Sequence, residues 1–223
     1  MKRFFAFTLA ETLVVIGIIG IVSALTLPNL NSSTGEKEKV AKVKKLYQNL
    51  DEAYSRAAVT YGPFKQWFKN DSTNVAQTTR FAGRLTEYMK ISKNCGSGAG
   101  CWTTADFQEY GNYYDNLKGA GFLFYTLADG TSLAISSSNS FARIKVDIDG
   151  PNKGPTVFGD DIFEFTISSY ETNGQVPNQI TPEMNPDIWD TTIYETAWVI
   201  YKENLDYLKC RNDLNWNTKT TCK

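Results

Sequence analysis

The stretch Phe7-Thr-Leu-Ala-Glu-Thr-Leu-Val-Val-Ile-Gly-Ile-Ile-Gly-Ile-Val-Ser-Ala-Leu-Thr-Leu-Pro28 decides how this chain is organised. As a helix, its apolar part from Phe7 to Leu27 spans about 30 Å, which is enough to cross a bilayer. It holds one carboxylate, Glu11, and placing a charge in hydrocarbon costs roughly 2.5–3.5 kcal/mol, so this residue indicates a function. Lys2 and Arg3 precede the run, so we expect the N-terminus in the cytoplasm and the bulk of the chain outside it.

The residues around Glu11 form a recognisable motif, Ala6-Phe7-Thr8-Leu9-Ala10-Glu11. It resembles the class III leader of type IV prepilins and type II secretion pseudopilins. The resemblance implies that a prepilin peptidase removes residues 1–6, methylates the new amine of Phe7 and leaves the apolar helix for assembly. Gly20 and Pro28 fall where helices of that family often carry Gly and Pro. Ala6 stands where Gly is usual, so we expect slower processing.

The carboxylate of Glu11 needs a partner when it leaves water. The amine of Phe7 in a neighbouring subunit is the natural partner, and this pairing would set the axial register between packed helices. Two alternatives stay open: a cleaved secretory signal, for which Ser23-Ala24 is a weak cleavage site, and an uncleaved anchor. The short basic region, the long apolar run and Glu11 itself argue against the secretory signal.

Composition excludes several function classes. The chain has 23 basic and 24 acidic residues, so no basic excess points to nucleic acid. It has no His, which excludes Ser-His-Asp and Cys-His nucleophilic machinery and His-ligated metals. Carboxylate-only catalysis stays formally open, but no motif asks for it. We therefore expect no enzymatic activity and no required cofactor.

The four cysteines, Cys95, Cys101, Cys210 and Cys222, form two pairs that are close in sequence. In a chain whose bulk is exported, they indicate disulfides formed in an oxidising compartment. Three connectivities exist, and short loops favour Cys95–Cys101 with Cys210–Cys222. Free buried thiols are the alternative, and neither spacing is that of a zinc knuckle.

An α+β fold is predicted, with a long N-terminal stalk helix packed on a small antiparallel sheet, as in pilins. Residues 7–28 form its transmembrane and assembly part, residues 29–61 its amphipathic continuation, and residues 62–223 the globular head. After a polar segment at residues 29–35, one apolar stripe recurs at spacings of three and four: Val40, Val43, Tyr47, Leu50, Tyr54 and Ala57. The stripe predicts docking on the sheet, with coiled-coil pairing as the lesser alternative. Gly62-Pro63 ends the helix, and we expect a break or bend near Pro28.

Residues 80–91 are predicted to form a short helix, and residues 93–102 a Gly-rich loop. Strands are predicted from alternation at residues 122–127, 131–136, 141–148 and 162–167, with Asp129-Gly130 turning the first pair. Residues 198–201 fit either a helix or a closing strand. These strands predict an antiparallel meander.

One loop offers five oxygen side chains: Asp147, Asp149, Asn152, Asp160 and Asp161. Calcium takes six to eight oxygen ligands on a flexible turn, and the resemblance adds weight because major pseudopilins hold calcium in a C-terminal loop. The alternative is that these Asp, Asn, Gly and Pro residues only form turns. Trp216, in the loop between Cys210 and Cys222, either anchors a partner or folds back into its own loop.

These features predict a structural subunit, a pilin or pseudopilin of a type IV pilus or type II secretion system. Its expected location is the inner (cytoplasmic) membrane, in a single pass, and then the pilus or pseudopilus. Its expected partners are sister subunits, the prepilin peptidase, the inner-membrane assembly platform and the membrane, with no nucleic acid. The alternative is a single-pass, membrane-anchored extracellular binding domain that does not polymerise.

Overall fold

The computed structural model describes residues 9–68, 73–104, 113–151, 153, 156–171, 176–182 and 194–222. Within these ranges the side chains of residues 23–33 and 113–115 are outside the description. The chain divides into two compact units, Met1–Glu38 and Lys39–Lys223. The boundary between them falls inside helix α1, which runs from Leu9 to Tyr61.

In the first unit, α1 is helical from Leu9 onward and continues through the polar segment at residues 29–35. The predicted break at Pro28 is absent from the backbone. Proline lacks the N–H donor for one backbone hydrogen bond, so a helix that continues through Pro28 gives up that bond. Across the described residues, none of the helices combines the length and the apolarity that crossing a membrane needs.

In the second unit, the apolar stripe of α1 packs on the sheet as predicted. Val43, Leu50 and Ala57 are fully buried. Tyr47 stacks on Phe165 of the sheet, with ring centroids 5.7 Å apart. The helix ends after Tyr61 because Gly62 adopts a φ of +79°, the left-handed region that favours glycine.

The sheet is a six-stranded antiparallel meander in which sequence neighbours are also spatial neighbours. Its strands are β1 (Ile91–Gly96), β2 (Leu123–Leu127), β3 (Ser132–Ser137), β4 (Phe141–Asp147), β5 (Ile162–Ser168) and β6 (Ile180–Pro182). The four strands expected from alternation are β2 to β5. Gly130, with a φ of +90°, closes the tight β2–β3 turn.

The region before β2 differs from the prediction. Helix α2 covers Asn74–Thr86, with Thr73 as its N-cap, so the helix predicted at residues 80–91 starts earlier and ends earlier. Ile91, the last residue of the predicted helix, instead opens β1, an edge strand that overlaps the start of the predicted loop. Two buried polar residues of α2, Gln77 and Thr78, hid its first half from the apolar pattern.

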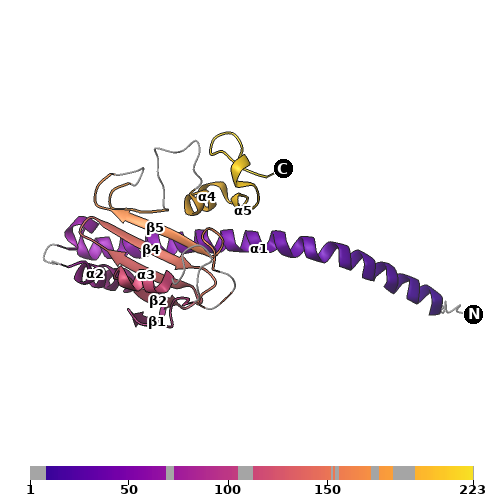
Figure 1. Cartoon of the computed structure of the whole chain (residues 1–223), viewed down its shortest axis with the longest axis horizontal. Coiled ribbons are helices and arrows are strands. Elements are labelled where there is room, and N and C mark those ends of the chain that lie inside the picture. The colour runs from indigo at the N-terminus through magenta and orange to yellow at the C-terminus, as the bar shows by residue number, and fades with distance from the viewer. Residues whose placement is uncertain are drawn as a thin grey trace, which may run out of the picture. The chain divides into compact units, whose positions relative to one another are not determined.

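Alternate strand residues face two cores. One face carries the main core, shared by α1, α2 and the strands, with Leu133 and Ile144 among its residues. The other face carries a smaller cluster that includes Phe124, Trp102 and Leu117. Leu117 belongs to helix α3 (Tyr113–Gly119), which is labelled in Figure 1. Phe64 of the 3-10 helix η1 (Phe64–Gln66) belongs to the main core.

The C-terminal region adds α4 (Glu195–Lys202), α5 (Tyr207–Cys210) and the 3-10 helix η3 (Arg211–Asp213). Helix α4 is the helical alternative that the sequence left open for residues 198–201. Trp198 is fully buried, and its indole Nε1 donates to Asn204 Oδ1 at 2.9 Å. Glu203 ends α4 in the left-handed conformation, and its carboxylate pairs with Lys44 of α1.

Candidate functional site

The described start of α1 presents apolar side chains on all sides. Nine of them between residues 9 and 22 are 53–80% exposed: Leu9, Leu13, Val14, Val15, Ile16, Ile18, Ile19, Ile21 and Val22. A helix that is apolar all round is normally buried in protein or lipid, and an exposed apolar surface of this extent marks an interaction site. This surface, which we call the apolar collar of α1, is the leading candidate for assembly.

Glu11 lies in the first turn of α1, exposed among these apolar residues. A carboxylate there is favoured locally by the helix dipole. Gly20 lies on the same helix, and nothing approaches within 4 Å of the position that a Cβ would take. The surface at Gly20 is therefore open for close approach of another helix.

Three of the predicted assembly and processing positions are only partly described or not at all. Ala6 and Phe7 lie outside the described residues, as does the start of the predicted membrane span. Pro28 lies in helical backbone, but its side chain is outside the description. The cleavage and methylation site therefore stays a prediction.

The predicted calcium loop lies between β4 and β5. Asp147, at the end of β4, is 1% exposed and accepts a hydrogen bond from Gly150 N at 3.0 Å. Burial, reinforced by the neighbouring Asp149, raises the pKa of Asp147 to about 8. One oxygen of Asp149, Oδ1, is buried without a hydrogen-bond partner among the described residues.

The second half of this loop meets a lysine of α1. Lys39 Nζ lies 2.5 Å from Asp160 Oδ1 and 3.0 Å from Asp161 Oδ1. Burial raises the pKa of Asp161, against the opposing effect of Lys39. Asn152 lies outside the described residues. Within the described part of the chain, no group of three or more Asp, Glu, Cys or His side chains is placed to hold a metal ion. Calcium stays a prediction.

Both disulfides connect as the short loops predicted. Cys95 bonds Cys101, and Cys210 bonds Cys222. The first ties the end of β1 to the segment that carries Trp102, and the second closes the C-terminal loop.

Trp216 takes neither of the two predicted roles in full. It is 5% exposed and packs edge-to-face on Trp198 of α4, with ring centroids 5.0 Å apart. Lys202 lies over its ring at 5.3 Å from the centroid. The indole therefore joins the C-terminal loop to the main core instead of filling its own loop or standing exposed.

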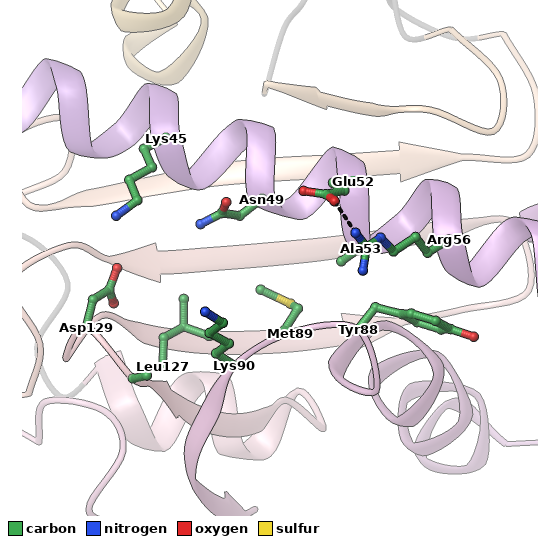
Figure 2. Close-up of a pocket in the computed structure, with 11 residues that line it drawn as sticks. Lys45, Asn49, Glu52, Ala53, Arg56, Tyr88, Met89, Lys90, Leu127 and Asp129 are labelled. Atoms are coloured by element: carbon green, nitrogen blue, oxygen red, sulfur yellow. Dashed lines mark hydrogen bonds and ion pairs between the residues drawn. The ribbon is translucent and has the colours of Figure 1, made fainter.

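A groove that sequence reasoning missed lies between α1 and the β1–β2 edge of the sheet. It encloses 420 Å³. Its α1 wall carries residues spaced along one helix face: Lys45, Asn49, Glu52, Ala53 and Arg56. The opposite wall comes from the α2–β1 link and the β2–β3 turn: Tyr88, Met89, Lys90, Leu127, Ala128 and Asp129 (Figure 2).

The opposite wall is held together by the backbone, because Ala128 N donates to Lys90 O at 2.8 Å. The groove joins segments that are far apart in sequence, and its polar residues form no motif. For this reason no sequence pattern could have found it.

Comparison with known proteins adds no relative to this description. Neither protein-family models nor curated proteins nor solved structures yield a match to the chain. Functional inference therefore rests on the residues and their geometry.

Proposed function

We propose that the chain is a structural subunit of a pilin-like or pseudopilin-like filament, processed by a prepilin peptidase and assembled through its N-terminal helix. The observation that carries the proposal is the apolar collar of α1, with Glu11 in its first turn. The motif at residues 6–11 supplies the processing step, and the α+β head with its two disulfides suits an exported domain.

The N-terminal helix would serve first in the inner membrane and then in the filament. Its run from Phe7 to Leu27 is long enough in sequence to lie across hydrocarbon. Transfer from lipid to the centre of a helical bundle keeps its apolar side chains out of water. The cost of moving it between the two environments is therefore small.

Cleavage before Phe7 creates a new cationic amine four residues before Glu11 in the sequence. Pairing Glu11 with the Phe7 amine of a neighbouring subunit neutralises both charges in an apolar environment. A single allowed pairing fixes the axial offset between neighbours, because any other offset leaves a buried charge without a partner.

The test compares Glu11→Ala with the unaltered chain in its native membrane. The proposal expects normal membrane insertion and loss of filament assembly, measured by fractionation and by electron microscopy of sheared material. Glu38→Ala is the matched control, because it also removes an exposed carboxylate from the same helix but lies outside the apolar collar. Normal assembly by Glu11→Ala would overturn the pairing and favour a membrane-anchored binding domain.

A further inference from the structure

The groove between α1 and the β1–β2 edge is lined by more cationic than anionic side chains. Within the described residues, Lys45 and Lys90 have no ion-pair partner, whereas Arg56 is bound by Glu52 at 2.5 Å. The remaining carboxylate, Asp129, is partly engaged, since its Oδ1 accepts from Thr131 N at 3.1 Å. Beside the Arg56–Glu52 pair, two lysines against one carboxylate leave the lining with a net charge of +1, and we call this part of the groove its cationic lip.

The floor of the groove is apolar. Ala53 and Leu127 are buried, and Met89, which also lines the groove, is half-buried. A volume of 420 Å³ is in the range that holds a drug-sized ligand or a few side chains. An apolar floor below a cationic lip suits a peptide that carries both a large apolar side chain and carboxylates.

The chain itself contains such a peptide, Glu183-Met-Asn-Pro-Asp-Ile-Trp-Asp-Thr-Thr-Ile193. These eleven residues include three carboxylates, no basic residue, and Trp189 as a large aromatic. They lie outside the described residues, so only their sequence enters the argument. We propose that the groove binds segment 183–193 of a second copy of this chain, a contact that rests on the proposed filament function.

The sheet topology favours a second copy over the same chain. The described residues that flank segment 183–193 are Pro182, at the end of β6, and Tyr194, before α4, and β6 is the edge strand at the other end of the sheet from β1. Four strand spacings separate β6 from β2, or about 19 Å, so a round trip needs about 38 Å. Eleven extended residues span at most about 40 Å, so the segment would reach the groove of its own chain only when almost fully extended.

A contact between two different edges of the same protein is heterologous. Such a contact repeats head to tail and forms an open filament unless its rotation closes a ring. The groove contact would thus add a lateral link between heads to the link between N-terminal helices.

The experiment places a photo-crosslinking amino acid at Asn49, an exposed residue of the groove wall, in the full-length chain in its membrane. Two copies are co-expressed, one with the photo-crosslinker at Asn49 and the other with Thr191→Ser as a mass marker in segment 183–193, and the crosslinked peptides are identified by mass spectrometry. The proposal expects crosslinks from Asn49 of one copy to the mass-marked segment 183–193 of the other. Crosslinks within a single copy, crosslinks to another segment, or no crosslinks would each overturn it.

Charge reversal gives the second measurement. Lys45→Glu with Lys90→Glu is expected to lower the crosslink yield at least about tenfold, because like charges then face each other. Adding Glu183→Lys, Asp187→Lys and Asp190→Lys to the same chain is expected to restore the yield. Lys65→Glu with Lys118→Glu is the control, because both lysines are exposed and lie outside the groove.

Failure of this contact is distinguishable from failure of the proposed function. A chain that is processed and assembled, but whose Asn49 crosslinks elsewhere, overturns the groove contact alone. A chain that keeps Met1 and does not assemble overturns the proposed function, and the crosslink still decides the groove contact.

Discussion

At the residue scale, a buried charge pair is the feature of the head that we expect to be most sensitive to substitution. Lys145 of β4 and Glu164 of β5 are direct cross-strand partners, and their charged groups are in contact. Lys145 is 9% exposed and Glu164 is 7% exposed. Arg143 Nε lies 3.5 Å from the same carboxylate. Such a pair contributes little net stability when intact, but removing Lys145 leaves the buried Glu164 carboxylate with the more exposed and more distant Arg143 as its ion-pair partner among the described residues.

We therefore expect Lys145→Met to destabilise the chain by about 3–5 kcal/mol, measured by urea unfolding. The double variant Lys145→Met with Glu164→Leu is expected to recover most of that loss, because no lone charge is then buried. A double variant as unstable as the single one would show that the pair itself is worth more than its desolvation cost.

The loop at Asp147 carries a second prediction, calcium binding. If calcium binds there, added calcium raises the melting temperature of the full chain and a chelator reverses the rise. Asp147→Asn removes a charged ligand and is expected to abolish the response. An unchanged melting temperature would leave Asp147, Asp149, Asp160 and Asp161 as turn formers, with Lys39 as the neutralising cation of the last two.

At the element scale, the second half of α1 is held by its buried stripe. Leu50→Ala removes a fully buried side chain and is expected to cost about 2–5 kcal/mol, since the cavity closes only in part. Val59, on the exposed side of the same helix at 89% exposure, is the control. Val59→Ala is expected to change stability by less than about 0.5 kcal/mol. Equal losses in denaturant unfolding would contradict the docking of the stripe.

The elements that the sequence predicted share a strong period. The stripe of α1 repeats every three to four residues, and Ala142, Ile144 and Val146 of β4 alternate with polar side chains, so the face that packs in the main core is predictable in both elements. The edge strand β1 was missed because half of its residues are exposed, none is buried, and it includes Ser, Lys, Asn and Gly. Thr78 concealed the start of α2, since its burial depends on a hydrogen bond to Ser137 that no local pattern reveals.

Of the two candidate sites, the assembly site could be predicted from the sequence and the groove could not. Glu11 and the apolar run are contiguous, so the sequence alone indicated them. The groove depends on a β2–β3 turn meeting α1 across a large sequence separation, so it required the fold.

At the scale of the whole molecule, the head buries several tyrosines whose ionisation reports on global unfolding. Burial raises the pKa of Tyr54 and of Tyr125, and the same cause raises that of Tyr207. A raised folded-state pKa means that the stability from these groups is complete below pH 10 and is lost as the pH rises through their folded values.

We expect a phenolate titration at 295 nm to show two classes of tyrosine. The buried class, Tyr54, Tyr125 and Tyr207, ionises only together with loss of the folded signal in circular dichroism. A single titration with an ordinary midpoint, while the fold persists, would contradict the burial of these rings.

The central claim is that the chain is a processed assembly subunit, and its most direct test is the intact mass and N-terminal sequence of the chain purified from its native membrane. The account predicts a mature chain that starts at an N-methylated Phe7. A chain that starts at Met1 would be an uncleaved anchor, and one that starts near Leu25 would be an ordinary secreted protein. Either result would contradict the account and remove the assembly role of Glu11.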